Sequence, residues 1–292
     1  MWRCRYKVDF AIQIRTMSCR ELWLACKRVT FPHFFSRREA ALRHVLETQR
    51  YVFSPIVMCH RYVIPDQADV ELEFGLDHCW WRFAASYNVG TTRNVPVIRV
   101  HRGESEGVMM RWGLVPAAAE GDASKASITD IAMEEIGQSP PIRDAWWKGQ
   151  RCILPVAGFY EWQLTRAGYR QPHFVRLVNR PVFGVAAIWD RSVVRDEDDI
   201  MESCALITVP SNPLMAEIHN TSQRMPAILH RDDYQAWLTA QPTDARTLLR
   251  TYPQDRMVAH PVSPRVNSPK YDDEALTRPI QPEIASVLSH VR

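Results

Sequence analysis

The sequence lacks the features that would place it in a membrane or in a secreted class. No apolar run approaches the roughly 18 residues that cross a bilayer. The apolar residues 10–14 are bounded by Asp9 and Arg15, which suits a secretory signal poorly. With 46% hydrophobic and 24% charged residues, the composition also excludes a disordered or fibrous chain. We therefore expect a cytoplasmic globular protein.

Patterns for disulfides, metals and phosphate loops are also missing. The seven cysteines are odd in number and contain no Cys-x-x-Cys pair, which argues against a disulfide framework and a zinc ribbon. The pairs 59–60 and 78–79 each join a cysteine to a histidine, but adjacent strand residues point to opposite faces and no spacing matches a zinc module. Gly-rich phosphate loops, Gly-x-Ser-x-Gly elbows and His-Glu-x-x-His helices are absent, which excludes those enzyme classes. We expect no metal and no cofactor.

Charge divides the chain near residue 57. Residues 1–57 carry 11 Lys and Arg against 4 Asp and Glu, whereas the remainder is net negative. This basic, aromatic-rich extension could bind nucleic acid or contain an amphipathic helix at 38–52. We favour a third interpretation, in which it lies upstream of the true start at Met58 or is removed. We expect a domain at residues 58–275 and a tail at 276–292.

From Met58 onward, short runs of β-branched and aromatic residues alternate with Pro and Gly, which predicts strands. The expected strands are residues 95–101, 108–115, 152–164, 173–177, 182–189, 204–209 and 257–262. The expected helices are residues 66–76, 142–148, 213–218, 231–239 and 245–252, and the longest loop is 117–127. Strands dominate without regular alternation with helices. The pattern therefore predicts an α+β fold with a mostly antiparallel, barrel-like sheet.

Cys59 directly follows a methionine at the point where the composition changes. If the preceding residues are absent, Cys59 offers a thiol and an α-amine whose pKa is about 8. Such a 1,2-aminothiol condenses with an aldehyde, because the amine forms an imine that the thiol closes into a thiazolidine. The alternative is an ordinary core cysteine in a strand.

Two other residues could carry protons. Glu161 lies among three aromatic residues in a predicted strand, and a buried carboxyl can act as a general acid or base near neutrality. The alternative is a core glutamate satisfied by an arginine such as Arg151. His219 ends a short helical run and could pair with Glu161, although a lone histidine is more often structural.

Taken in order, these segments resemble the SOS-response-associated peptidase family of abasic-site processing proteins. The matching stretches are residues 58–62, 87–89, 95–99, 111–116, 151–162, 218–220, 224–226, 262–263 and 266–267. The Gly-Phe-Tyr-Glu-Trp block at 158–162, after Trp-Gly-Leu-Val-Pro at 112–116, is the specific part. The resemblance covers residues 58 to about 270.

The resemblance implies a chemistry. In that family the initiator methionine is removed, and the exposed cysteine forms a covalent thiazolidine with the ring-opened aldehyde of an abasic site in single-stranded DNA. Cys59 is then the nucleophile, Glu161 assists imine formation, its reversal and self-removal of the preceding residues, and His219 supports sugar opening and proton transfer. The resemblance thus implies autopeptidase, crosslink-reversal and possible lyase activities in the DNA damage response, by a nucleoid-associated monomer.

The chain departs from the family at three places. The family's Asn-Ala-Arg-x-Glu segment falls on residues 130–134, so Asp130 replaces the asparagine at the site and Ala132 replaces the arginine. His219 lies three residues further from Arg224 than the common family spacing, although its spacing from Thr208 matches. His60 stands where the family has glycine.

DNA contacts are expected from Arg61, Arg111, Trp112, Thr208 and Arg224, because guanidinium groups neutralise phosphates and an indole can stack on a base. Core packing is the alternative for Trp112. Two other functions remain open: an autopeptidase that cleaves before Cys59 without DNA crosslinking, and an inactive single-stranded DNA binding module.

Overall fold

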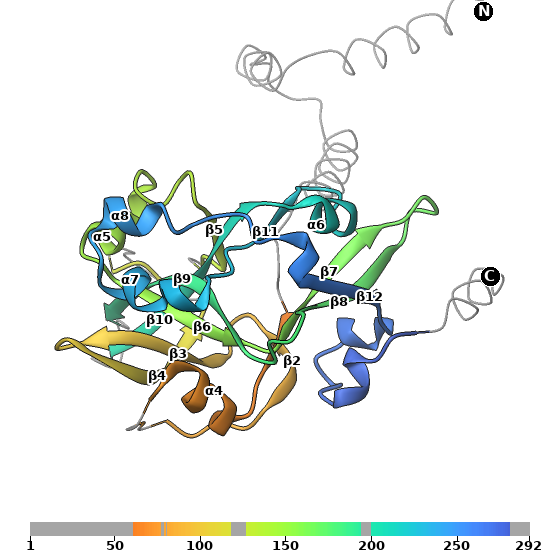
Figure 1. Ribbon diagram of the computed structural model, residues 1–292, viewed down its shortest axis with the longest axis horizontal. Helices are drawn as coiled ribbons and strands as arrows, with labels where there is room; N and C mark the ends of the chain where they lie inside the picture. Colours follow the sequence, from red (N-terminus) through yellow and green to blue (C-terminus); the bar gives the residue numbers. More distant parts are fainter. Residues whose placement is uncertain (1–60, 77–78, 80, 118–126, 194–199, 281–292) are drawn as a thin grey trace, which may run out of the picture. The chain divides into compact units, whose positions relative to one another are not determined.

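The computed structural model describes residues 61–76, 79, 81–117, 127–193 and 200–280, whose arrangement is drawn in Figure 1. The N-terminal extension at 1–57, Cys59 and most of the expected loop at 117–127 lie outside the described residues. So does the tail beyond residue 280.

Five of the described strands close into a barrel. In ring order these are β3 (Asn94–His101), β4 (Glu104–Trp112), β10 (Ile200–Pro210), β9 (Phe183–Val193) and β6 (Arg151–Val156). Neighbours pair antiparallel, except that β4 and β10 run parallel. The C-terminal half of β10 also pairs with β5 (Asp130–Ala132) and β11 (Arg224–Pro226). The barrel strands are rich in Val, Ile and Ala, which fill its interior.

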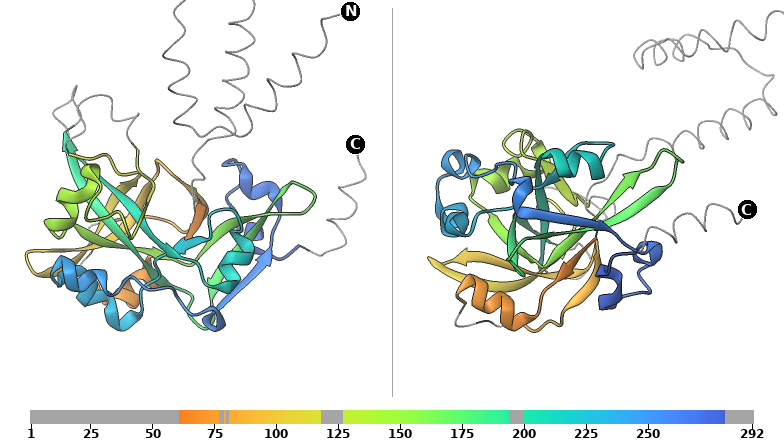
Figure 2. Two further views of the ribbon diagram at one scale, coloured as in Figure 1. Left: turned by 90° about the horizontal axis from the view of Figure 1, so that it is seen from above. Right: turned by 45° about the vertical axis from the view of Figure 1, so that its right-hand side comes forward.

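A second sheet lies beside the barrel and is antiparallel throughout its described strands. Its order is β12 (Met257–Pro261), β8 (Arg170–Leu177), β7 (Gly158–Leu164), β1 (Arg61–Ile64) and β2 (Ser86–Gly90). Phe159 and Val175 belong to the main core, whereas Tyr160 and Phe174 form a second cluster with residues of the segment 262–276. The hairpin of β7 and β8 projects away from the barrel in every view (Figures 1 and 2).

The described helices are short and lie around the sheets. They are α4 (Gln67–Phe74), α5 (Pro140–Trp147), α6 (Pro213–Ile218), α7 (Tyr234–Thr239) and α8 (Pro242–Arg246), with 3-10 turns at Arg231–Asp233, Gln254–Arg256, Pro264–Asn267 and Glu274–Thr277. Local sequence sets the start of α6, because Asn212 accepts from the Met215 amide at 2.9 Å and Pro213 fixes the first turn. Among the described residues, no helix is long and apolar enough to span a membrane.

The structure confirms the predicted α+β fold with a mostly antiparallel barrel. The single strand expected at 152–164 is wrong, since Ala157 separates β6 in the barrel from β7 in the second sheet. The strand expected at 108–115 instead ends at Trp112, before Gly113 with its φ of 122°. The helix expected at 245–252 is also wrong. Residues 249 and 252 are buried there, but the helix is α8 and ends earlier.

Gly158 lets the second sheet pack closely at the start of β7. A Cβ atom at this position would lie 2.3 Å from the Phe174 ring and 2.8 Å from the Val175 carbonyl oxygen. The ring can rotate, but the backbone oxygen belongs to the strand paired with β7. An added methyl group must therefore move β7 against β8.

We expect Gly158→Ala to lower the free energy of unfolding by about 2 kcal/mol, because overpacking forces the backbone to shift. Gly137→Ala is the matched control, since its Cβ would meet its nearest neighbouring atom, in the Trp146 ring, at an ordinary 3.6 Å. We expect that control to change stability by no more than about 0.5 kcal/mol. Urea unfolding measures both, and equal effects of the two variants would contradict the proposed close approach.

Candidate functional site

Strand β7 holds Glu161 in a fixed and buried position. The side chain is 2% exposed and lies on the same face as Phe159 and Gln163. On the opposite face, the Tyr160 hydroxyl donates to the Tyr87 carbonyl at 2.8 Å and Trp162 Nε1 donates to Asn267 Oδ1 at 2.8 Å. These two hydrogen bonds fix the orientation of β7. The opposite face of the strand, which carries Glu161, is therefore fixed as well.

His173 lies directly across the sheet from Glu161. The two residues are register partners in the antiparallel pair of β7 and β8, so their side chains share one face. His173 Nδ1 lies 3.1 Å from the Gln171 carbonyl, and burial lowers the pKa of its imidazole. His173 is therefore a neutral neighbour of Glu161 at physiological pH.

His219 ends α6 and is 3% exposed. Two contacts join this helix end to the strand that carries Glu161. Gln163 Nε2 donates to the Glu217 carbonyl at 3.2 Å, and the Asn220 side chain both accepts from and donates to the Leu164 backbone at 3.1 and 2.9 Å. Glu161 and His219 are thus brought to one region by β7 and α6, which lie side by side (Figure 1).

Arg224 is held by β10 and by a neighbouring carboxylate. Its Nε donates to Thr208 Oγ1 at 3.1 Å and its Nη2 donates to the Thr208 carbonyl at 2.8 Å. The same Nη2 lies 2.9 Å from Glu134 Oε2. The guanidinium is 23% exposed, so it retains a face toward solvent.

Asp130 lies in β5, within electrostatic reach of both Arg224 and His219. Burial raises the pKa of its carboxyl, while a hydrogen bond from Thr129 Oγ1 at 3.1 Å and the charge of Arg224 act in the opposite direction. The structure therefore brings Asp130, Thr208, His219 and Arg224 together at the C-terminal half of β10.

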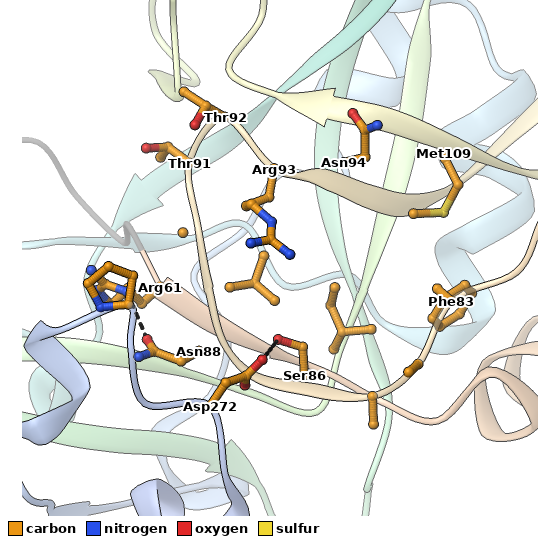
Figure 3. A pocket seen from close by; sticks show the side chains of 16 residues that line it. Arg61, Phe83, Ser86, Asn88, Thr91, Thr92, Arg93, Asn94, Met109 and Asp272 are labelled. Carbon is orange, nitrogen blue, oxygen red and sulfur yellow. Dashed lines mark hydrogen bonds between the residues drawn. The ribbon is translucent and has the colours of Figure 1, made fainter.

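Arg61 begins β1 beside a cavity of about 710 Å³. Its Nη1 donates to Asn88 Oδ1 at 2.9 Å and its Nη2 donates to the Asn267 carbonyl at 3.2 Å. Figure 3 shows Arg93 pointing into this cavity from the turn between β2 and β3. Asp272 lies at its border and accepts from Ser86 Oγ at 2.8 Å. Two guanidinium groups, the Asp272 carboxylate and several neutral hydrogen-bonding groups thus line the cavity.

Three predicted DNA contacts have different surroundings. Arg111 is half-buried, with Nη1 bonded to the Gly113 carbonyl and 3.4 Å from Ser127 Oγ. Trp112 is 0% exposed, donates to the Thr129 carbonyl at 3.0 Å and packs edge-on against Tyr62. Thr208 is 1% exposed. In this structure Trp112 is a core residue and Thr208 supports Arg224, and their contact with DNA stays a prediction.

The described cysteines are poor nucleophiles. Burial raises the pKa of the Cys152 thiol, raises that of Cys204 to about 12 and raises that of Cys79 to a lesser extent. Thiolates are the reactive form, so burial makes these three thiols less reactive than a free cysteine. Cys59 lies outside the described residues. No three His, Cys, Asp or Glu side chains within the described ranges could together hold a metal ion.

Sequence reasoning missed Arg93 and His173. Arg93 lies in a turn four residues after the matching stretch 87–89, and its closeness to that stretch was the available signal in the sequence. His173 becomes a neighbour of Glu161 only through strand register, which the sequence does not show.

Comparisons with known proteins agree on one family. A family model described as SOS response associated peptidase (SRAP) matches residues 58–269. Abasic site processing protein YoqW of Bacillus subtilis is 29% identical over 225 residues, covering 75% of this chain and 98% of that protein. Abasic site processing protein HMCES of Gallus gallus is 29% identical over 235 residues, covering 68% of each.

Solved structures show the same fold. A Bacteroides thetaiotaomicron protein matches with a TM-score of 0.69 at 22% identity, covering 76% of this chain and 100% of that one. A Bordetella bronchiseptica protein matches with a TM-score of 0.62 at 28% identity, covering 70% of this chain and 100% of that one.

We expect Asp130→Asn to stabilise the protein at about pH 7.5. Because burial raises the pKa of this carboxyl, the folded protein binds its proton more tightly than the unfolded chain does. Wild-type stability therefore falls as pH rises from about 4, the ordinary aspartate value, through the raised value. The variant lacks this loss. Thermal unfolding at about pH 7.5 and pH 4 measures the difference, and a variant advantage that grew toward pH 4 would contradict the assignment.

Proposed function

Because the chain belongs to the SOS response associated peptidase family, we propose that it processes abasic sites in DNA, as the names of its relatives state for those proteins. We further propose that it does so by a covalent thiazolidine crosslink through Cys59. The observation that carries this proposal is the buried Glu161, which β7 holds next to the start of β1.

Strand register and chain length support the pairing of Cys59 with Glu161. Tyr62 pairs antiparallel with Phe159, so positions toward the N-terminus of β1 run alongside positions toward Glu161 on β7. Cys59 precedes Arg61 by two residues, and successive Cα atoms are about 3.8 Å apart. Two such steps span at most about 8 Å, so the link between Cys59 and Arg61 is short enough for the proposed pairing.

The crosslinking reaction needs an amine, a thiol and two proton carriers. The Cys59 α-amine attacks the aldehyde carbon, and the resulting hydroxyl leaves as water to give an imine. The thiolate then adds to the imine carbon, which forms the C–S bond, and the nitrogen takes up a proton. Amine, aldehyde and thiol thus give thiazolidine and one water. In this scheme Glu161 supplies the proton to the leaving hydroxyl, and His219 moves protons to and from the sugar oxygen.

The free α-amine exists only when residues 1–58 are absent. We propose that hydrolysis of the bond before Cys59, with Glu161 as the assisting carboxyl, is the peptidase reaction of this chain. The boundaries 58–275 for the domain and 276–292 for the tail stay predictions.

We propose single-stranded DNA as the partner, bound through its phosphates by Arg61, Arg93, Arg111 and Arg224. The cavity beside Arg61 has room for part of a nucleotide and presents two guanidinium groups, which pair well with a phosphodiester. An abasic nucleotide has no base to stack, so a single strand bends easily at that point. We expect the protein to act as a monomer.

We expect the protein beginning at Cys59 to form an adduct with a single-stranded oligonucleotide that carries one abasic site. Intact mass should equal protein plus DNA less one water. Cys59→Ala should abolish the adduct, and Glu161→Gln should slow it by about 100-fold or more, the usual range for losing a general acid or base. Cys79→Ala is the matched control, since its thiol has a raised pKa, and it should react like wild type.

The outcomes separate the candidate functions. Processing before Cys59 without any DNA adduct would leave an autopeptidase alone. Salt-sensitive DNA binding without processing or adduct would leave an inactive binding module. Either result would overturn the crosslinking proposal.

We expect Arg61→Gln to weaken binding of single-stranded DNA and to flatten its salt dependence by about 0.7 in the slope of log K against log salt, the effect of one lost phosphate contact on a single strand. Arg143→Gln is the control, because that arginine lies in α5 beside Asp144. Fluorescence anisotropy at several salt concentrations measures both. An unchanged slope for Arg61→Gln would show that this guanidinium does not contact phosphate.

A further inference from the structure

The hairpin of β7 and β8 extends beyond the rest of its sheet. Strand β12 pairs with β8 only from His173 to Leu177, and β1 pairs with β7 at Gly158 and Phe159. The outer part of the hairpin therefore has no third strand among those that the structure describes. Its end, residues 164–170, is here called the hairpin tip. Figures 1 and 2 show this tip away from the barrel, where another molecule can reach it.

Hydrogen bonds close the turn of the hairpin tip. The backbone N–H and the hydroxyl of Thr165 both donate to the Tyr169 carbonyl, at 2.9 and 3.0 Å, and Gly168 N donates to the Thr165 carbonyl at 2.9 Å. Gly168 has a φ of +85°, which glycine adopts without steric cost and which a three-residue hairpin loop requires at this position. The tip therefore holds its side chains on a defined backbone.

The hairpin tip is also joined to the candidate site. Asn220 directly follows His219, and its side chain accepts from Leu164 N at 3.1 Å and donates to the Leu164 carbonyl at 2.9 Å. Leu164 is three residues from Glu161 in the same strand. The position of the tip is therefore fixed relative to both Glu161 and His219.

Tyr169 lies on the face of the hairpin that carries Glu161. His173 is the register partner of Glu161, and side chains on one face of a strand recur every two residues, so Tyr169 shares the face of His173. The four residues between them span about 13 Å. Stacked nucleotides follow one another at about 3.4 Å, so a DNA strand that starts at the site reaches Tyr169 within about four nucleotides.

The side chains of the hairpin tip suit a single strand of DNA. The Tyr169 side chain is an aromatic ring on a residue that is 48% exposed. Arg166 and Arg170 are exposed and form no ion pair with any residue that the structure describes. The tip contains no acidic residue, and Glu217 lies at the base of the hairpin, where α6 meets β7. An aromatic ring between two cations is the combination that binds bases and phosphates together.

We propose that the hairpin tip binds single-stranded DNA beside the abasic site, with Tyr169 stacked on a base and with Arg166 and Arg170 on phosphates. This inference rests on the proposed DNA partner and adds a second contact region to it. An abasic nucleotide has no base to stack, so stacking energy must come from its neighbours along the strand. The tip lies where such a neighbour would be.

The test uses the protein that begins at Cys59 and two single-stranded oligonucleotides with one abasic site. The long one has about ten nucleotides on each side, and the short one has a single nucleotide on each side and ends before the hairpin tip. For equilibrium binding, a stable abasic analogue without the aldehyde replaces the reactive site. Fluorescence anisotropy measures binding, and intact mass measures the adduct with the reactive oligonucleotide.

We expect Tyr169→Ala to weaken binding of the long oligonucleotide by about tenfold, within the usual range for one lost base stack. Tyr169→Phe retains the ring and should bind within about twofold of wild type. Tyr169→Ala should form the adduct with the short oligonucleotide at the wild-type rate. Trp147→Ala is the matched control, because that residue is 55% exposed on α5, and it should bind the long oligonucleotide like wild type.

The two arginines are tested by salt dependence. We expect the double variant Arg166→Gln, Arg170→Gln to flatten the slope of log K against log salt for the long oligonucleotide by about 1.4, the effect of two lost phosphate contacts on a single strand. Arg102→Gln is the control, because this exposed arginine lies in the turn between β3 and β4. It should leave the slope unchanged.

The outcomes separate this inference from the proposed function. Wild-type binding of the long oligonucleotide by Tyr169→Ala would overturn the inference and leave the hairpin tip as a surface for another partner. A slower adduct of Tyr169→Ala with the short oligonucleotide would also overturn it, since the residue would then support the site. Failure of the wild-type protein to bind either oligonucleotide would overturn the proposed DNA partner. Binding without an adduct would overturn only the crosslinking proposal, and anisotropy would still decide the role of the tip.

Discussion

The paired arrangement of β10 is the constraint on which both the fold and the candidate site depend. Its N-terminal half closes the barrel between β9 and β4. Its C-terminal half continues past the barrel and pairs with β5 and β11, which carry Asp130 and Arg224. The eleven residues of β10 therefore run from the barrel core into the polar cluster around Arg224, and the core fixes the position of that cluster. Because Thr208 lies within this strand and bonds Arg224 through both its side chain and its carbonyl, the strand fixes the position of the guanidinium.

The site combines buried acidic and basic groups without neutralising them in simple pairs. Arg224 forms hydrogen bonds with the Thr208 backbone and side chain and an ion pair with Glu134. Its charge lowers the pKa of Asp130 by less than burial raises it. Burial then dominates and raises the pKa of Asp130. On the second sheet, Glu161 lies opposite a histidine whose pKa is lowered by burial. Asp130 thus occupies surroundings that favour its protonated form more than water does.

Sequence patterns predicted the strand-rich fold because runs of β-branched and aromatic residues are typical of buried strands. They predicted one strand where a continuous apolar run forms strands of two sheets, which Ala157 separates. They also predicted a helix where buried residues such as Tyr252 lie outside any helix. Trp112 was ambiguous for the same reason, since an indole suits either a core or a base. Glu161 and His219 were predicted as site residues from their segments, whereas His173 becomes a neighbour of Glu161 only through strand register.

The C-terminal layer has a consequence for synthesis on the ribosome. Strand β12 and the residues up to Leu276 complete the second sheet and its smaller apolar cluster. Asn267 in this layer binds both Arg61, the first residue of β1, and Trp162, which follows Glu161 in β7. A nascent chain lacking these residues leaves the sheet without its outer layer. The second sheet can therefore be completed only after the residues up to Leu276 have left the ribosome, however early the barrel strands are made.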